Sequence, residues 1–403
     1  MTDAMWLTGG YPWVGDPVAG NFFRTQAQAL SRLGLDLTVV APMPAAPWPL
    51  SRMRVRWRLH AASPREEHDG AVRVVRPRFL NVPGQPAWAV PDRFVARAAW
   101  AARHDWEGAR LIHGHYAVTG LAAWRLARRA GLPFVLTFHG DDMNTWPDDY
   151  PGRRSDLRRA VREAGLVIAV SRALAERVRE VTGVEALALP LGSHHAALAE
   201  MRVPRDEARS RLSIPADQIV VLYVGYLLRR KGVRELADAI LEVGDPLIGM
   251  FVGDGPEAGY GLGSTGAPVR IRYQGARSHN DVILHMSAAD VLVLPSEAEG
   301  LPTVIVEAGS VGLPVIASSA GGIPELLSDG RGTILPEISA RAIATALRTF
   351  LEERDEARAS SLRLRDLVVR DYDVDRNASR LLDLYRSVAG GLVREGVDEL
   401  LPT

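Results

Sequence analysis

The stretch VVLYVGYLLRRKGVRELADAILE, residues 220–242, decides the fold class. It begins with an apolar run rich in β-branched and aromatic side chains, which favours a strand buried on both faces. Gly225 ends that run at a tight turn, and from about 232 onward the residues have the pattern of an amphipathic helix. The stretch therefore predicts a strand, a turn and a helix, which together form one repeating unit of a parallel α/β sheet.

The same alternation recurs on both sides of this stretch. We expect strands near 4–8, 37–41, 72–76, 110–114, 134–138, 167–170 and 186–189, and then near 219–225, 247–252, 270–274, 291–294, 314–317 and 332–335. Helices are expected near 21–33, 119–130, 155–164, 172–181, 232–242, 279–287, 303–311, 339–353 and 373–388. The predicted fold class is α/β, with two doubly wound Rossmann-like domains facing a cleft.

The chain has 403 residues, which suits two such cores better than one. The stretch 200–218 is polar and charged, so we interpret it as the link between the domains. The first domain is then expected at 1–200 and the second at 201–371, followed by a closing helical segment at 372–403.

Composition excludes several classes of protein. There is no cysteine, which excludes disulfides and cysteine-bound metals and favours a reducing compartment. No apolar run approaches the ~18 residues of a membrane span, and the first residues are expected to form a strand and not a signal peptide. We expect a cytoplasmic protein, with peripheral contact at the inner face of the membrane as an open alternative.

Charge is unevenly distributed although the net charge is zero. Residues 1–200 hold 25 Arg against 19 acidic residues, a net +6, and residues 201–403 hold the opposite excess. Two explanations stay open: the first half meets something anionic, or the two halves attract each other.

Polar and glycine residues gather where the predicted strands end, and ligands of open α/β sheets bind beyond those ends. These residues are Gly9, Gly10, His139, Gly140, Asp141, Asp142, Gly225, Tyr226, Gly253, Asp254, Gly255, Glu297, Glu299 and the turn at 321–325. Their shared placement predicts one ligand site between the two domains.

The segment EGLPTVIVE, residues 299–307, is the strongest local motif. Pro302 suits the first turn of a helix, because its missing N–H has no partner there. The amides of Leu301, Thr303 and Val304 would then face outward at a positive helix end, which suits a diphosphate. Two surface glutamates flanking a buried helix are the alternative.

Lys231 is the single lysine among 48 basic residues. It follows a strand and a tight turn, where an ammonium group can reach a phosphate. A solvated charge at a helix start is the alternative, and it suits Arg229 and Arg230 better.

Two further patterns point away from cofactors. Gly253, Gly255 and Gly259 resemble a dinucleotide fingerprint, but the spacing is wrong, so we interpret them as a tight turn near the base pocket. His113 and His115 point the same way on one strand, yet a third metal ligand is missing, and we expect no metal site. His139, at a strand end, either projects into the cleft or is structural.

Residues 48–60 alternate four arginines, at positions 52, 54, 56 and 58, with apolar residues. If this segment is extended, the arginines share one face. That face is either a patch for anionic lipid or a charged acceptor, or a solvated edge strand whose charges prevent pairing.

Taken together, these motifs resemble the GT-B-fold retaining glycosyltransferases of family GT4, over nearly the whole chain. The resemblance is carried by the Gly9–Gly10 turn, PVAGNFFRTQAQAL at 17–30, HGHY at 113–116, FVLTFHGDD at 134–142, AVS at 169–171, VGYLLRRKG at 224–232, GDGP at 253–256, the Glu299/Glu307 pair, GGIPELL at 321–327 and a final helix. Among family members, these motifs most resemble those of enzymes that build bacterial cell-surface polysaccharides.

The resemblance implies roles for individual residues. His139, Glu299 and Lys231 would be catalytic, Glu307 would bind the ribose, and the final helix would cross back to the first domain. The donor side would comprise Gly10, Gly225, Tyr226, Arg230, Lys231, Gly253, Gly255, Glu299, Gly300, Leu301, Pro302, Thr303 and Glu307. The acceptor side would comprise Gly20, Asn21, His115 and Asp142.

A family member of this kind would need no cofactor or metal. It would take a nucleotide-diphosphate sugar and a carbohydrate or lipid-linked acceptor, and no nucleic acid. Two departures stand out: Tyr226 replaces the usual Arg, and Pro190–His194 differs from the family's Pro-Asn-Gly-Val-Asp stretch. A nucleotide-sugar epimerase and a non-catalytic sugar-nucleotide-binding protein stay open as alternatives.

Overall fold

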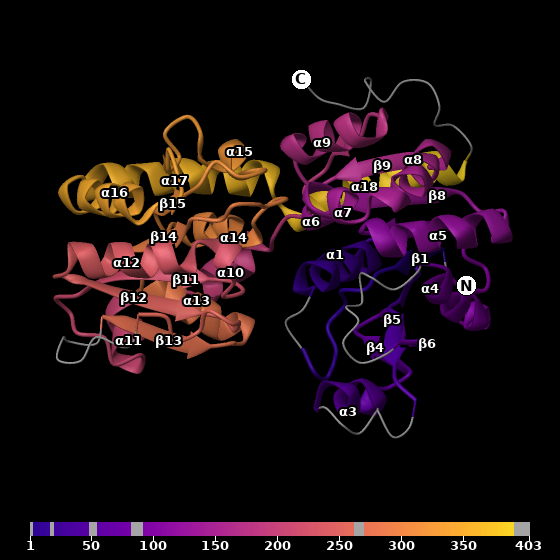
Figure 1. The fold of residues 1–403 in the computed structure, drawn as a ribbon, viewed down its shortest axis with the longest axis horizontal. Coiled ribbons are helices and arrows are strands. Elements are labelled where there is room, and N and C mark those ends of the chain that lie inside the picture. Colours follow the sequence, from indigo (N-terminus) through magenta and orange to yellow (C-terminus); the bar gives the residue numbers. More distant parts are fainter. Residues whose placement is uncertain (1–2, 17–19, 48–54, 82–91, 262–269, 391–403) are drawn as a thin grey trace. The chain divides into compact units, whose positions relative to one another are not determined.

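The computed structural model describes residues 3–16, 20–47, 55–81, 92–261 and 270–390 (Figure 1). Its internal contacts divide the chain into two units. The first unit consists of Met1–Leu191 and Val374–Thr403, and the second unit is Gly192–Asp373. Both units are built around a mainly parallel sheet, which confirms the expected α/β class with two Rossmann-like units.

The first unit contains a sheet in the order β10-β9-β8-β7-β1-β2-β5-β4, in which only β4 pairs antiparallel, and a small β3-β6 pair. Its elements are β1 Ala4–Leu7, α1 Asn21–Arg32, β2 Leu37–Val40, β3 Met43–Ala45, α3 Val55–Ala62, β4 Glu66–Asp69, β5 Val72–Val75, β6 Arg78–Leu80, α4 Asp92–Ala101, β7 Leu111–His115, α5 Ala117–Ala130, β8 Phe134–Phe138, α6 Asp141–Asn144, α7 Trp146–Asp149, α8 Arg154–Glu163, β9 Leu166–Ala169, α9 Arg172–Thr182, β10 Leu187–Ala188 and α18 Val374–Ala389, with 3-10 turns at Arg103–Trp106 and Pro151–Arg153.

The second unit contains a parallel sheet in the order β13-β12-β11-β14-β15-β16. Its elements are α10 His195–Met201, α11 Arg205–Arg211, β11 Ile219–Val224, the 3-10 turn η4 Arg229–Lys231, α12 Val233–Val243, β12 Leu247–Val252, β13 Ile271–Gly275, α13 His279–Ala288, β14 Val291–Leu294, α14 Thr303–Val311, β15 Val315–Ala317, α15 Ile323–Leu327, β16 Thr333–Ile334, α16 Ala340–Glu352 and α17 Arg354–Asp371.

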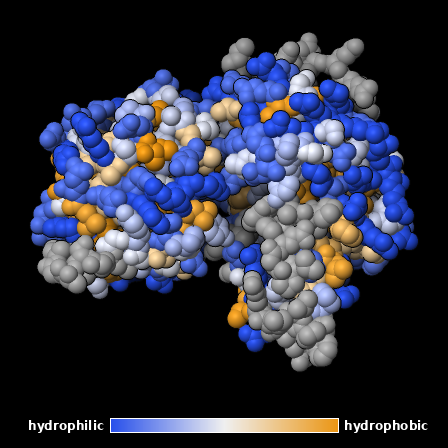
Figure 2. Space-filling view, viewed as in Figure 1, coloured by the Kyte–Doolittle hydropathy of each residue, from blue (hydrophilic) through white to orange (hydrophobic). Residues whose placement is uncertain are grey.

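The central strands are buried because their apolar runs are covered by helices on both faces. All four residues of β1 and of β14 are buried, as the continuous apolar sequence of each predicts. The strand order changes direction between β11 and β14. Because connections between parallel strands are almost always right-handed, this change is expected to put the connecting helices on opposite faces of the sheet. Hydrophilic side chains dominate the visible surface of each unit (Figure 2).

The last helix, α18, completes the core of the first unit, where Figure 1 shows it in yellow among purple elements. It packs along α1, and its Tyr385 hydroxyl accepts a hydrogen bond from the Trp6 indole at 2.8 Å. Both side chains are buried. The chain therefore returns to its first strand after completing the second unit.

Two expectations from the sequence are wrong. Residues 55–58 lie in helix α3 and are not extended, so Arg56 and Arg58 do not share a face by the two-residue alternation of a strand; positions 52 and 54 lie outside the described residues. The stretch 200–218 is not a plain link, because it contains α11. Arg209 of α11 is buried and pairs with Asp290 at 2.6 Å, so this segment belongs to the core of the second unit.

Candidate functional site

The second unit brings together the residues that follow three neighbouring strands. Strands β11, β14 and β15 are adjacent and parallel, so their carboxyl ends meet at one edge of the sheet. Lys231 follows β11 and Glu299 follows β14, while the Gly321 turn follows β15. Parallel topology thus converts residues far apart in sequence into neighbours.

Lys231 and Glu299 form the central contact of this edge. The Lys231 Nζ lies 2.6 Å from Glu299 Oε1, and it also donates to the Ala298 carbonyl at 3.3 Å. The two side chains are 17% and 14% exposed, so this charged pair is neither deeply buried nor freely solvated. The ammonium group is held at the loop before α14, where a charge-assisted bond is short and directional.

A glycine turn holds the loop that carries Glu299. Gly321 has φ of 52°, and a Cβ at this position would lie 2.0 Å from the Glu299 carbonyl oxygen. The next amide, of Gly322, donates to the Gly300 carbonyl at 2.9 Å. Only glycine combines this left-handed conformation with so close an approach. The turn therefore packs directly against the backbone of the loop that carries Glu299.

Helix α14 presents unpaired amides beside this pair. Its N-cap is Pro302, and the Ile305 amide donates to the Pro302 carbonyl at 3.0 Å. In the part of the chain that the structure describes, the amides of Leu301, Thr303 and Val304 donate to no protein group. A helix start with free N–H groups and the positive end of the dipole is an anion site.

Glu307 lies one turn further along α14, facing His279 of α13. The His279 Nδ1 is 3.8 Å from Glu307 Oε1, too long for a hydrogen bond. Burial raises the pKa of Glu307 to about 7 and lowers the pKa of His279, and both shifts favour the neutral forms. We therefore treat this contact as a weakly charged pair rather than a salt bridge. Our sequence reasoning missed His279, although its position just after β13 was a signal.

The remaining donor-side predictions fall around the same edge. Tyr226 is 59% exposed, and its carbonyl accepts from the Tyr223 hydroxyl at 2.8 Å. Burial and then the Glu299 carboxylate raise the pKa of Tyr223, while the Arg230 guanidinium lowers it, so both charges lie within electrostatic reach of this ring. Arg229 differs, because it pairs with Glu235 of α12.

The three glycines at 225, 253 and 255 form two turns that touch. The Gly225 amide donates to the Val252 carbonyl, and a Cβ on Gly253 would lie 1.9 Å from the Gly225 carbonyl oxygen. These glycines therefore allow the ends of β11 and β12 to approach each other, in agreement with the tight turn that we expected there.

The first unit gathers its predicted residues at the ends of β1, β7 and β8. Gly20 has φ of 63° and is the N-cap of α1, with Asn21 as the first helical residue. A Cβ on Gly20 would lie 1.3 Å from the Gly10 carbonyl oxygen, so the two glycine turns are pressed together. This close approach brings the start of α1 to the end of β1.

His115, which is buried, and His139, which is half-buried, form a pair at this edge. The His115 Nδ1 lies 3.2 Å from His139 Nε2, so one ring donates to the other. Among the described residues, the outer nitrogens, His115 Nε2 and His139 Nδ1, have no hydrogen-bond partner. Burial lowers the pKa of His139 to about 3 and the pKa of His115 as well, so both rings are neutral near pH 7.

Aromatic rings enclose this pair. Phe22, Phe23 and Tyr116 lie with their ring centroids 5.6, 4.9 and 4.8 Å from that of His139. The sequence did not predict this enclosure, because no local pattern places Phe22 and Phe23 beside His139. The result is an apolar environment around an imidazole that keeps one nitrogen available.

His113 and Asp142 have structural contacts. The two ring nitrogens of His113 contact Tyr385 Oη at 2.5 Å and Thr137 Oγ1 at 2.7 Å. The Asp142 carboxylate accepts the amides of His139 and Gly140 at 3.0 and 2.7 Å. Asp142 is 7% exposed, and burial raises its pKa to about 7. Its hydrogen bonds to the two amides hold the backbone of the His139 loop. In the described ranges, no cluster of three or more potential ligands could hold a metal ion.

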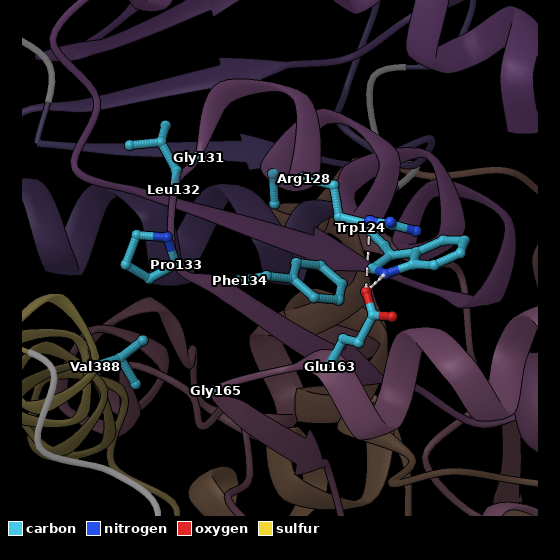
Figure 3. Close-up of a pocket in the computed structure, with 10 residues that line it drawn as sticks. Trp124, Arg128, Gly131, Leu132, Pro133, Phe134, Glu163, Gly165 and Val388 are labelled. Atoms are coloured by element: carbon cyan, nitrogen blue, oxygen red, sulfur yellow. Dashed lines mark hydrogen bonds and ion pairs between the residues drawn. The ribbon is translucent and has the colours of Figure 1, made fainter.

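A cavity of about 380 Å³ lies elsewhere in the first unit (Figure 3). Figure 3 shows the Trp124 indole and the Glu163 carboxylate pointing toward each other, and their hydrogen bond is 2.6 Å long. Phe134 begins β8 and Gly165 precedes β9, so the cavity lies at the amino ends of these strands. It is therefore at the opposite end of the strands from His139.

The family model described as Glycosyltransferase Family 4 matches residues 19–188, and the model described as Glycosyl transferases group 1 matches residues 204–363. The putative teichuronic acid biosynthesis glycosyltransferase TuaC of Bacillus subtilis is 35% identical over 386 residues, which cover 95% of this chain and 98% of the relative.

Two solved structures share the fold of both units. Sucrose-phosphate synthase from Thermosynechococcus elongatus matches with a TM-score of 0.79 at 23% identity, covering 97% of this chain and 100% of the other. Anabaena HepE in complex with UDP and glucose matches with a TM-score of 0.71 at 20% identity, covering 96% and 100%. These similarities show that this chain has the GT-B fold of both proteins.

Proposed function

This chain belongs to glycosyltransferase family 4, and from that premise we propose that it transfers a hexose-type sugar from a nucleotide diphosphate to a carbohydrate acceptor, with retention and without a metal ion. The proposal goes beyond family membership in four respects: the donor, the stereochemistry, the absence of a metal and the acceptor.

The donor proposal is supported by the Lys231–Glu299 pair beside the free amides of α14. This arrangement offers an ammonium group and several N–H groups to one anion, and a carboxylate to the hydroxyls of a sugar. A nucleotide-diphosphate sugar contains both chemical groups. We assign Glu307 to the ribose, whose hydroxyls would donate hydrogen bonds to its carboxyl oxygens. HepE, which shares the fold, was solved in complex with UDP and glucose.

The metal-free mechanism rests on how a leaving diphosphate is neutralised. Lys231 and the α14 amides supply fixed positive charge where negative charge develops, which is the strongest general device for such a step. The bond between the anomeric carbon and the phosphate oxygen breaks while the acceptor oxygen forms its bond on the same face. The acceptor proton passes to the departing phosphate oxygen.

The acceptor proposal is supported by similarity to TuaC. That relative is named for teichuronic acid biosynthesis, so we propose a cell-surface polysaccharide, free or lipid-linked, as the acceptor of this chain. None of the described helices has the length and apolar character to cross a bilayer. Cytoplasmic location and peripheral contact with the inner membrane face belong to the same proposal.

The single observation that carries the proposal is the contact between Lys231 and Glu299. The experiment is a thermal-shift screen of the intact protein against UDP-, GDP-, ADP- and dTDP-sugars, because a ligand that binds only the native form raises Tm. The hit is then incubated with acceptor polysaccharide in EDTA, and the anomeric configuration of the product is determined by NMR. An inverted product or a strict need for added metal contradicts the mechanism.

A non-catalytic sugar-nucleotide-binding protein is a second candidate, favoured by the replacement of the usual Arg by Tyr226. It predicts a thermal shift without turnover on any acceptor. An epimerase predicts a new sugar nucleotide from donor alone, and none of the relatives named above is an epimerase. Chromatography of the donor with and without acceptor separates these outcomes.

A further inference from the structure

A groove between α4 and α5 of the first unit is lined by four arginines. It has a volume of about 590 Å³, and its walls include Arg93, Arg97, Trp100, Arg125 and Arg129. The four arginines are exposed and come in pairs four residues apart, two on each helix. Like charges at this spacing repel by about 0.2–0.5 kcal/mol per pair, so the free protein gains nothing from the arrangement.

Three of the four guanidinium groups have no acidic partner in the described ranges. Arg125 is paired with Asp92 and Asp156, whereas Arg93, Arg97 and Arg129 contact no carboxylate. The residues 82–91, which precede α4, contain no Asp or Glu in their sequence either.

Other arginines of the first unit do form ion pairs. Arg73, Arg159 and Arg177, for example, each form an ion pair with a nearby acid. Against this background the groove is a site of uncompensated positive charge, and such a site attracts an anion.

Trp100 organises the groove. The Arg129 guanidinium lies over its ring, 4.0 Å from the ring centroid, which fixes a flexible side chain by a cation–π contact. A guanidinium held flat in this way still presents its N–H edge, which matches the two oxygens of a carboxylate. The groove therefore has an oriented anion receptor and not only a diffuse charge.

The position of the groove relative to the end of β7 suggests an extended ligand. Helix α5 begins at Ala117, just after His115, whereas Arg125 and Arg129 lie in its second half. At 1.5 Å per residue the groove is roughly 12–18 Å along the helix from the sheet edge where His139 lies. A ligand that reaches both places must be several sugar units long.

From these observations we propose that the α4–α5 groove binds an acidic glycan, a chain whose sugar units carry carboxylates, as a subsite for the growing acceptor. This rests on the proposed function for the direction of transfer, but the binding itself does not depend on catalysis. A bilayer surface fits the geometry less well, because it contacts protruding groups, whereas these arginines line a recess. The proposal also accounts for the net positive charge of residues 1–200 by an anionic ligand.

The test measures binding of fluorescein-labelled oligogalacturonate to the full-length protein by fluorescence anisotropy. We expect saturable binding that weakens as salt is raised, and no binding of a labelled neutral maltooligosaccharide. The double variant Arg97→Gln/Arg129→Gln should bind at least roughly tenfold more weakly, since it removes two charge-assisted contacts. Trp100→Leu should give a smaller loss, because Arg129 then loses its support.

The matched control is Arg110→Gln/Arg162→Gln, which removes the same charge from exposed arginines elsewhere in the first unit. Equal weakening in this control overturns the proposal, because net charge alone would then explain binding. Binding to phosphatidylglycerol vesicles or to single-stranded DNA, without binding to the acidic glycan, also overturns it.

Transfer assays then separate this inference from the proposed function. With long acidic acceptors, the groove variant should show a raised KM and unchanged kcat, and with short acceptors it should match the parent protein. If transfer occurs but the groove variant is unaffected with both acceptors, the subsite is wrong and the proposed function stands. If the glycan binds in the groove but no transfer occurs, the subsite stands and the proposed function is wrong.

Discussion

The two sheet edges of this protein use opposite chemistry. At the edge of the second unit, a lysine and a glutamate form a partly exposed ion pair beside free helix amides. At the edge of the first unit, two histidines are kept neutral by burial among aromatic rings. The partly exposed ammonium group and helix amides can bind an anion that arrives from water. A neutral imidazole in an apolar environment can instead form a hydrogen bond with a hydroxyl group. The same fold thus provides a charged edge and an uncharged edge.

The largest expected effect comes from removing the lysine of the charged edge. Lys231→Ala should lower the transfer rate by about 10²–10³, the size seen when one preorganised donor to a developing anion is removed. Arg229→Ala is the control, because Arg229 lies on the same 3-10 turn but pairs with Glu235. Steady-state kinetics check this, and equal activity of both variants would show that Lys231 is not a catalytic residue.

The second effect concerns the pH dependence of stability at Glu307. Burial raises the pKa of its carboxyl from 4.5 to about 7 in the folded state. The folded protein therefore holds this proton more tightly than the unfolded chain, and stability is fully present below pH 4.5 and is lost as pH rises to about 7.

Glu307→Gln should abolish that loss, so the variant should be more stable than the parent above pH 7 by about 1–3 kcal/mol. Urea unfolding at pH 5 and pH 8 measures the difference. His279 runs in the opposite direction, because burial lowers its pKa, and comparison of variant with parent removes its contribution. A constant difference between the two pH values would contradict the buried carboxyl.

The third effect tests the uncharged edge. His115→Phe keeps a ring in the buried stack but removes the hydrogen bond to His139, so the tautomer of His139 is no longer fixed. Transfer should fall by roughly tenfold, within the range of a misplaced hydrogen-bonding group, while Tm changes little. Nitrogen NMR of the His139 ring reports the tautomer directly. Unchanged spectra with full activity would make His115 a packing residue only.

The smallest effect extends the charged edge. Tyr226→Arg restores the cation that the family usually places there, at a position where the side chain is 59% exposed. An exposed charge contributes about 0.2–1 kcal/mol, so the Kd for the nucleotide diphosphate should fall up to roughly fivefold. Isothermal titration calorimetry at two salt concentrations checks it, since a screened charge loses its effect at high salt.

The edges differ in how far the sequence could predict them. The strands and the α14 start were predictable because each is a local run: the apolar segment before Gly225 and the Pro302 signal need no distant partner. The Lys231–Glu299 contact was also within reach, since parallel strands bring their ends together. The charged edge is therefore largely a product of short-range pattern and sheet topology.

The uncharged edge depends on long-range contacts that no local pattern contains. The sequence gives no sign that Phe22 and Phe23 enclose His139, or that Asp142 would turn inward to hold its own loop. The alternation of arginine and apolar residues at 52–58 would place the arginines on one face only in an extended segment, but residues 55–58 belong to helix α3. Arg209 looked like part of a solvated link because its partner Asp290 is 81 residues away.

The hydrogen bond between Trp6 and Tyr385 spans 379 positions of the chain. During synthesis on the ribosome, the first strand emerges long before the helix that completes its core, whereas Gly192–Asp373 is continuous and can close as soon as it is made. The second unit is thus free to fold first. A premature stop before Tyr385 would leave the first sheet with an uncovered apolar face, and so would affect solubility before it affected catalysis.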